Sequence, residues 1–388
     1  MREFRIDLSA PPIPFPHYWE ECVGSCHAAL GLREDWRWQL KRCHDELGFR
    51  RVRFHGLLNE DMNIWTGDEA CPYSFFNVDA IIDFLLGIGM KPFIELSFMP
   101  EGLASGQETI FHYRANVTPP RDYAAWKRLV GELARHLVDR YGAEEVRRWP
   151  FEVWNEPNLA CFWTGSREEY FRLYRAAAEA IKEVDGGIPV GGPATAKNEW
   201  IPELIEYCEA SGTPLDFVST HHYPTDMALG HGLDMEAAMA ASKRGILTDM
   251  AAKARLEAGK YPLYYTEWNS SPSSRDPYHD DPYAAAFILK TVADNQGLVE
   301  IYSYWTFSDI FEEVYFPSLP FHGGFGLLNL HGIPKPSYYA FRVLHLLGKE
   351  RLPVTAEGGE ETVECLATIG RRGLAVAVYN HQIPRAPI

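Results

Sequence analysis

Residues 151–184 read FEVWNEPNLACFWTGSREEYFRLYRAAAEAIKEV, and this stretch indicates the fold class. The apolar run at 151–154 predicts a short buried strand, and the amphipathic pattern at 167–184 predicts the helix that follows it. Mostly apolar strands of this kind are typical of parallel sheets that are covered on both faces. The stretch is therefore one β–α unit.

The same unit recurs along the chain. Eight units over roughly 330 residues predict an α/β protein built as a (β/α)8 TIM barrel. The alternative, an open doubly wound sheet, is disfavoured because no strand leads into a GxGxxG turn; the glycines at 185–193 and 322–326 have other spacings. The predicted strands are 21–24, 51–54, 91–96, 151–154, 189–191, 217–221, 263–267 and 301–305. The predicted helices are 35–46, 79–86, 123–141, 167–184, 200–210, 234–258, 280–295 and 337–347.

The two ends of the chain follow a different pattern. Short β-rich runs at 2–8, 354–356, 362–369 and 374–379 are separated by glycine-rich turns. They predict a small accessory antiparallel β-sheet formed from the N- and C-terminal segments. We expect a catalytic barrel at 15–348 and the accessory sheet at 1–14 and 349–388, where the sheet either leans on the barrel or is a shortened β-sandwich.

Composition excludes several classes of function. The chain has 37 Lys and Arg against 53 Asp and Glu, a net charge of −16, which argues against nucleic acid or an anionic membrane as a partner. No apolar run is long enough to span a bilayer, and the N-terminus lacks the apolar core of a signal peptide. Seven scattered cysteines favour free thiols, so we expect a cytoplasmic protein.

Polar and aromatic residues follow the predicted strands, at the end of the barrel where such enzymes carry their active sites. The fourth strand ends in WNEPN at 154–158 and the seventh in TEWN at 266–269, so Glu156 and Glu267 emerge at one mouth. Paired carboxylates suit glycoside hydrolysis, which needs one protonated and one ionised carboxyl group. A metal at His221 and His222 is disfavoured because adjacent strand residues point to opposite faces. The cysteines likewise lack the spacing of a zinc site.

These motifs resemble the acid/base and nucleophile motifs of a large clan of retaining glycosidases built on (β/α)8 barrels. More specifically, the sequence resembles glycoside hydrolase family 39, the β-xylosidase family, from about residue 18 to about residue 379. Members usually continue into a longer C-terminal β-sandwich. The matching stretches are CVGSCHAALGLREDW (22–36), ELGFRRVRFHG (46–56), STHHYPTD (219–226), SYWTFSDIFEE (303–313) and HGGFGLLNLHGIPKPSYYAF (322–341).

The resemblance implies roles for individual residues. Glu156 would be the general acid/base and Glu267 the nucleophile, with Tyr223 hydrogen-bonded to the Glu267 carboxylate. Asn155 would hold the sugar 2-hydroxyl, and a cis peptide would follow Trp305. The remaining residues expected to bind the sugar are His55, His221, Trp305 and one or both of Glu312 and Glu313.

We therefore expect a retaining exo-β-glycosidase, above all a β-xylosidase, acting on xylo-oligosaccharides or aryl glycosides without a cofactor or metal. A related specificity (α-L-iduronidase, β-glucosidase or arabinosidase) and a catalytically silent sugar-binding barrel remain alternatives. An iduronidase would need Lys or Arg beside the sugar to hold the substrate carboxylate. A homo-oligomer also remains open.

Overall fold

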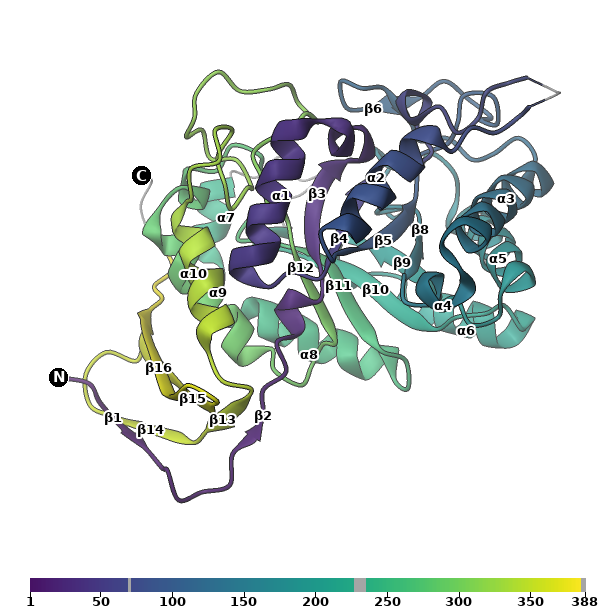
Figure 1. Cartoon of the computed structure of the whole chain (residues 1–388). Helices are drawn as coiled ribbons and strands as arrows, with labels where there is room; N and C mark the ends of the chain where they lie inside the picture. The colour runs from purple at the N-terminus through teal and green to yellow at the C-terminus, as the bar shows by residue number, and fades with distance from the viewer. Residues whose placement is uncertain (69–70, 227–234, 385–388) are drawn as a thin grey trace.

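The computed structural model describes residues 1–68, 71–226 and 235–384, and its centre is a closed barrel of eight parallel strands (Figure 1). Each strand pairs with its neighbour in chain order, and β12 closes the ring against β3. The predicted (β/α)8 architecture is thus confirmed. The barrel strands are β3 (Val23–His27), β4 (Arg51–His55), β5 (Lys91–Leu96), β8 (Phe151–Val153), β9 (Val190–Thr195), β10 (Phe217–His222), β11 (Leu263–Trp268) and β12 (Ile301–Tyr304).

Helices surround the barrel, as the amphipathic patterns predict. In most units the observed helix lies within a few residues of the predicted one. The sixth predicted helix differs, because residues 235–258 hold two helices, and residue 234 lies outside the described part. A serine–glycine turn separates them: Ser242 Oγ donates to the carbonyl of Met239, and Gly245 precedes the second helix. The helices are α1 (Glu34–Leu47), α2 (Phe76–Gly87), α3 (Tyr123–Tyr141), α4 (Ala143–Val146), α5 (Arg167–Val184), α6 (Ile201–Ser211), α7 (Met235–Ala241), α8 (Ile246–Ala258), α9 (Pro282–Asp294) and α10 (Pro336–Leu346).

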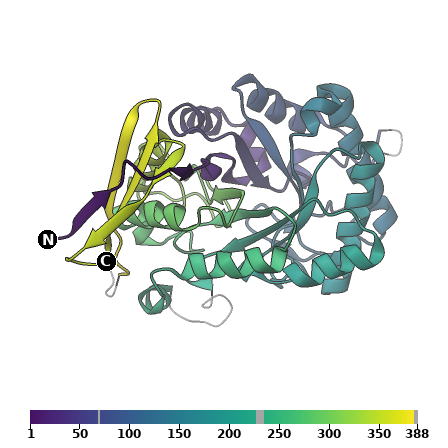
Figure 2. The ribbon, with the colours of Figure 1, turned by 90° about the horizontal axis from the view of Figure 1, so that it is seen from below.

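The two ends of the chain meet beside the barrel (Figure 2). They form two antiparallel sheets instead of the single predicted one: four strands in the order β16–β15–β13–β2, and the pair β1–β14. Strands of two or three residues, such as β2 and β13, are too short to leave an alternating pattern. The domain boundaries after residues 14 and 348 stay predictions. The accessory strands are β1 (Glu3–Ile6), β2 (Ile13–Pro14), β13 (Glu350–Leu352), β14 (Val354–Glu357), β15 (Val363–Gly370) and β16 (Gly373–Asn380); β6 (Thr109–Ile110) and β7 (Ala115–Asn116) form a separate hairpin.

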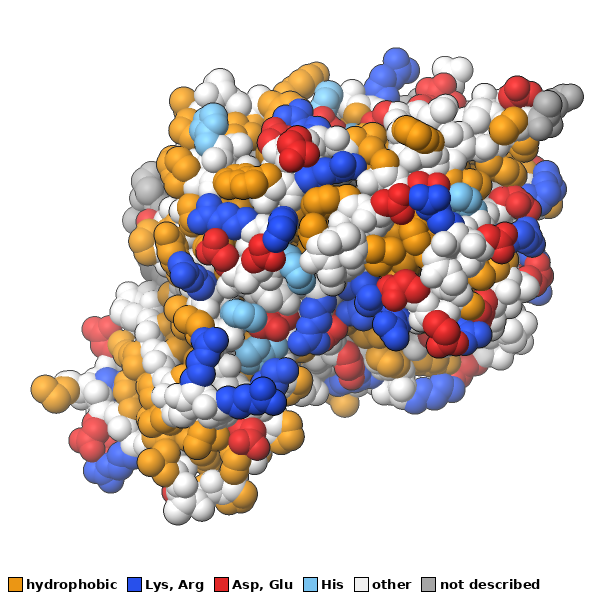
Figure 3. Space-filling model, viewed as in Figure 1, with side chains coloured by type: hydrophobic (Ala, Val, Ile, Leu, Met, Phe, Trp, Pro, Cys, Tyr) orange, Lys and Arg blue, Asp and Glu red, His pale blue; other side chains and the backbone are white. Residues whose placement is uncertain are grey.

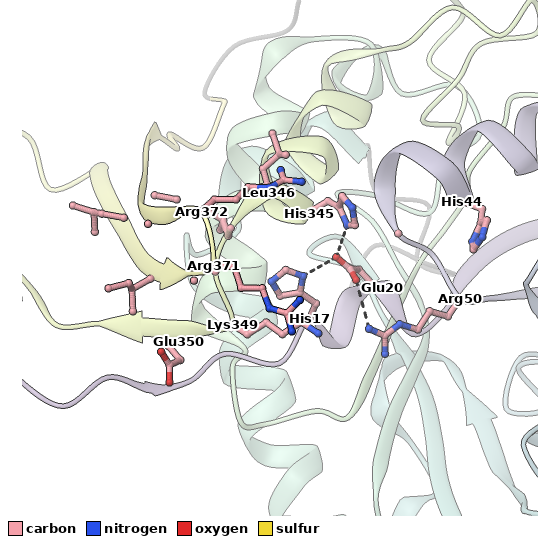
Figure 4. Close-up of a pocket in the computed structure, with 18 residues that line it drawn as sticks. His17, Glu20, His44, Arg50, His345, Leu346, Lys349, Glu350, Arg371 and Arg372 are labelled. Atoms are coloured by element: carbon pink, nitrogen blue, oxygen red, sulfur yellow. Dashed lines mark hydrogen bonds and ion pairs between the residues drawn. The ribbon is translucent and has the colours of Figure 1, made fainter.

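A basic cavity of about 980 Å³ lies where the four-stranded sheet meets the barrel (Figure 4). Basic and histidine side chains gather at this junction on the surface (Figure 3). Glu20 is buried there, with His17 and His345 within 2.8 Å of its Oε1. His17 and Glu20 precede the first barrel strand, and His345 lies in the last turn of the last barrel helix, α10. The cavity therefore lies at the N-terminal end of the barrel, away from Glu156 and Glu267.

None of the described helices combines the length and the apolar composition that a bilayer-spanning segment requires.

Candidate active site

Glu156 and Glu267 come from opposite parts of the barrel and are both buried. Glu267 lies within β11, whereas Glu156 follows β8 by three residues. Trp154 and Glu156 have positive φ angles of 73° and 43°, a conformation that bulky side chains rarely adopt. The backbone N–H of Glu156 donates to the carbonyl of Ala194, at 2.8 Å. This bond to the neighbouring strand holds the turn that carries Glu156.

The two carboxylates approach each other closely around His221. One oxygen of Glu156, one oxygen of Glu267 and one ring nitrogen of His221 all lie within 4.8 Å of one another. His221 Nδ1 is 2.9 Å from Glu156 Oε1 and 3.7 Å from Glu267 Oε2. The hydroxyl of Tyr223 donates to Glu267 Oε2 at 2.9 Å, the contact that the family resemblance predicts. The two carboxyl groups are therefore close enough to act on the same bond of a ligand that lies between them.

A fully buried arginine organises the floor of this site. The guanidinium of Arg53, in β4, contacts Glu152 through Nε (2.6 Å) and Glu267 through Nη1 (2.9 Å). Its Nη2 donates to Asn155 Oδ1 (3.0 Å) and contacts Glu95 (2.8 Å). Because Asn155 accepts through its oxygen, its NH₂ group is the side that remains to donate to a ligand.

Sequence reasoning missed the roles of Arg53, Glu95 and Glu152. Arg53 did leave a signal, since it is a charged residue two positions before His55 in a buried strand, where alternation points both side chains to one face. Glu95 and Glu152 lie in strands that otherwise read as apolar runs. No pattern in the amino-acid sequence indicates that the side chains of Arg53, Glu95 and Glu152 meet inside the barrel.

Burial sets the protonation of the groups at the mouth. It raises the pKa of Glu156 to about 7, against the positive charges of His55 and Arg53, which act to lower it. Burial likewise raises the pKa of Glu313 to about 8 and lowers that of His221 to about 4. At neutral pH the site therefore holds a neutral His221 and a Glu156 that is protonated in about half of the molecules.

The remaining predicted residues surround the same mouth. His55 lies 2.7 Å from Glu95, 3.5 Å from Glu267 and 3.8 Å from Glu313. The Trp305 ring lies 4.7 Å from the His55 ring. The peptide between Trp305 and Thr306 is cis, as predicted. These contacts leave an aromatic wall on one side of the paired carboxylates.

Gly24 makes room for that wall. A Cβ atom at this position would lie 2.5 Å from Cε3 of the Trp305 indole, closer than real contacts allow. The neighbouring strand β3 thus needs a glycine where it passes behind Trp305.

Glu312 and Glu313 diverge, although they are adjacent. Glu313 faces His55, and its Oε1 is a buried atom without a hydrogen-bond partner among the described residues. Glu312 instead lies 2.5 Å from Nδ1 of His27, whose ring stacks on Tyr113. Asp61, 2.6 Å from Nε2, holds His27 from the other side. Glu313 is therefore at the mouth, and Glu312 is one layer behind it.

His222 points away from His221, as strand alternation predicts. Its Nε2 lies 2.7 Å from the hydroxyl of Tyr302, and its ring stacks on Tyr265. Both rings of this contact are buried in the barrel wall. His222 is thus a core residue, separate from the paired carboxylates.

Comparison with known proteins identifies the family. The chain matches the family model described as glycosyl hydrolases family 39 over residues 3–383. The chain belongs to this family and is a glycoside hydrolase. It is 59% identical to a β-xylosidase of Caldicellulosiruptor saccharolyticus over 375 residues, 96% of this chain and 77% of that protein. It is 40% identical to a β-xylosidase of Geobacillus stearothermophilus over 352 residues, 87% of this chain and 70% of that protein.

The solved structures agree with this assignment. A β-xylosidase from Caulobacter crescentus CB15, described as monomeric, superposes with a TM-score of 0.85 at 37% identity. That match covers 96% of this chain and 75% of the other. A more distant relative, human α-L-iduronidase, is 27% identical over 322 residues, which cover 76% of this chain and 46% of that protein.

We expect Arg53→Met to destabilise the protein strongly. Removing the guanidinium leaves buried carboxylates without their counter-charge, which typically costs ~3–5 kcal/mol. The free energy of unfolding in urea measures this loss. Arg140→Met is the matched control, because Arg140 is exposed and solvent screens its ion pair with Asp83. Equal losses in the two variants would contradict the central role of Arg53.

Proposed function

We propose that the protein is a retaining exo-acting β-xylosidase that releases terminal xylose from short xylo-oligosaccharides. The observation that carries the mechanism is the short distance between the two carboxyl groups: one oxygen of Glu156 lies within 4.8 Å of one oxygen of Glu267. Retaining glycosidases hold their carboxyl groups ~5–5.5 Å apart, whereas inverting enzymes need ~6.5–9.5 Å to admit a water molecule. The substrate class rests on the 59% and 40% identical β-xylosidases.

In the first step, Glu267 attacks the anomeric carbon while Glu156 protonates the departing glycosidic oxygen. Tyr223 and Arg53 each hold one oxygen of Glu267, so its carboxylate keeps the orientation for attack. The bond to the leaving sugar breaks as the ester to Glu267 forms. In the second step, Glu156 takes a proton from a water molecule as the water oxygen attacks the anomeric carbon. The ester to Glu267 breaks, xylose is released, and both carboxyl groups return to their starting states. The two steps transfer protons only between water, Glu156 and the sugars, and no electrons are gained or lost. The proposed reaction therefore requires no cofactor.

The sugar would be held by the groups around this pair. The Asn155 amide donates to the 2-hydroxyl, and Trp305 packs against the apolar face of the ring. Oε1 of Glu313 is buried and has no hydrogen-bond donor among the described residues, so it is suited to accept a hydrogen bond from a sugar hydroxyl. His55 and His221 complete the polar contacts, while Glu312 acts through its contact with His27.

An α-L-iduronidase is the second candidate. The observation in its favour is Lys197, whose positive charge acts on Glu156 and could face a substrate carboxylate. The iduronidase relatives support this candidate less strongly than the β-xylosidases support the first one, because they are much less identical to this chain.

The cellular location and oligomeric state also remain proposals. All seven cysteines are free, which supports a reducing cytoplasm. The sequence leaves a homo-oligomer open, and one structural relative is described as monomeric.

A panel of nitrophenyl glycosides tests the specificity. We expect kcat/KM to be highest for the β-xyloside, ahead of the β-glucoside, the α-L-arabinoside and the α-L-iduronide. An NMR time course should detect β-xylose as the first product. The α-anomer appearing first would exclude the double displacement, and a preference for the iduronide would select the second candidate.

Glu156→Ala should separate the two carboxylates by their roles. Nitrophenolate leaves without a proton, whereas a sugar needs one, so kcat/KM should fall far more on xylobiose than on an aryl xyloside. The gap should be on the order of 10²–10⁴-fold, the usual contribution of general acid catalysis. Azide should then attack the intermediate and yield β-xylosyl azide.

Glu267→Ala is the control for that experiment, because loss of the nucleophile should affect both substrates alike. Equal losses on both substrates for Glu156→Ala, without an azide product, would refute the acid/base role.

The pH profile of kcat/KM should report Glu156 on its basic side. Because the acid must be protonated, activity should fall as the pH rises through about 7, the pKa to which burial raises this group. Glu156→Gln should remove this basic limb, measured on xylobiose, whose leaving sugar needs the proton. A limb that persists in Glu156→Gln would assign it to another group.

A further inference from the structure

A buried chain of hydrogen bonds runs behind Glu156. From Glu156 Oε1 it passes to His221 Nδ1 (2.9 Å), and from His221 Nε2 to Thr266 Oγ1 (3.1 Å). It ends where the Thr266 hydroxyl meets Glu152 Oε1 at 2.7 Å. All four side chains are nine-tenths buried or more. The chain of bonds thus links the turn after β8 to β10 and β11 and returns to β8.

The positions of the protons in this series of hydrogen bonds follow from the group at its end, Glu152. Arg53 Nε occupies the other oxygen of Glu152, so Glu152 is a carboxylate that can only accept. The Thr266 hydroxyl must therefore donate to Glu152, and it has a single hydrogen. Its oxygen then accepts from His221, which places the ring hydrogen on Nε2.

This tautomer decides what His221 can do for Glu156. A neutral imidazole with its hydrogen on Nε2 has only a lone pair on Nδ1. The lone pair faces Glu156 Oε1, so the contact is a hydrogen bond only when the Glu156 carboxyl is protonated. Burial lowers the pKa of His221 to about 4, which agrees with a neutral ring at working pH.

We propose that Thr266 is a positioning residue that fixes the tautomer of His221 and thereby keeps the catalytic proton on Glu156 between turnovers. This inference rests on the proposed acid/base role of Glu156 and adds the residue that controls its protonation. Once Glu156 has given up its proton, it faces a lone pair. That repulsion favours recapture of a proton from water, which is the task of the base in the second step.

Many other charges also act on Glu156, and a test must leave them in place. Replacing Thr266 by valine keeps the volume of the side chain and changes no charge, so it removes only the hydroxyl. The titratable groups that face Glu156 from the surrounding elements are Arg53, His55, Glu95, Cys161, Lys197, His221, Tyr223, Asp226, Glu267 and Glu313.

The pH profile of Thr266→Val on xylobiose, whose leaving sugar needs the proton of Glu156, is the first measurement. Without the hydroxyl, His221 can move its hydrogen to Nδ1 and donate to the ionised Glu156 carboxylate, which lowers the pKa of Glu156. The basic limb of kcat/KM should move down by about one to two pH units, the effect of one hydrogen bond to a charged group.

Two variants control this experiment. Thr266→Ser keeps the hydroxyl and should restore the position of the limb. Thr220→Val removes a buried hydroxyl from the neighbouring strand, where it donates to the carbonyl of Thr195, and should leave the limb unmoved. An equal shift in both valine variants would mean that the limb reports general loosening of the barrel, which overturns the proposal.

The ¹⁵N spectrum of the His221 ring tests the tautomer directly and requires no substitution. At a pH just below the wild-type limb, the wild-type protein should have hydrogen on Nε2 and a bare Nδ1. In Thr266→Val the Glu156 carboxyl is already ionised at that pH, so the His221 ring should gain hydrogen on Nδ1. A wild-type ring with hydrogen on Nδ1 would overturn the proposal even if the valine variant failed to fold.

The failures of the two proposals can be told apart. A basic limb that persists in Glu156→Gln refutes the acid/base role itself. A limb that disappears in Glu156→Gln but stays in place in Thr266→Val refutes only the role of Thr266.

Discussion

One buried guanidinium is the constraint on which the active site depends. Arg53 contacts three carboxylates, Glu95, Glu152 and Glu267, and all of them are buried. Removing charges from water is costly, and the mutual attraction of the ions offsets that cost only when every hydrogen-bonding position is filled. The fork of five N–H donors on arginine meets this demand, which the single ammonium of a lysine would not.

The same network limits how much further negative charge the mouth can hold. His55 adds a second cationic group: burial acts to lower its pKa, but the charge and hydrogen bond of Glu95 and the charge of Glu267 together raise it. With three carboxylates against two cations, an ionised Glu156 or Glu313 would have no partner left. Burial of these two carboxyl groups in the closed network is the main cause of their raised pKa values. Glu267 differs from Glu156 in having Arg53 and Tyr223 on its two carboxylate oxygens.

Sequence patterns predict the parts of this structure that depend on local chemistry. The barrel strands appear as short apolar runs. Glu156 and Glu267 belong to motifs at strand ends, so the sequence alone selects both as candidates. Arg53 and Thr266 could not be assigned their partners, because these lie on other strands and meet only when the barrel closes. The break between α7 and α8 was missed for the opposite reason, since a local turn interrupts a pattern that looks continuous.

The balance of charge around Arg53 also suits the proposed use of one glutamate as both acid and base. In the resting state of the proposed mechanism, Glu267 is ionised and Glu156 is protonated, so the group formed with Arg53, His55 and their buried carboxylates carries one net negative charge. In the covalent intermediate of that mechanism, Glu267 is an ester and Glu156 has lost its proton. The charge has moved from one side chain to the other, and the total is unchanged. Loss of the negative charge on Glu267 lowers the pKa of Glu156 at the step where it has just become a carboxylate. The fixed counter-charges thus stabilise both halves of the cycle, and the site needs no rearrangement between them.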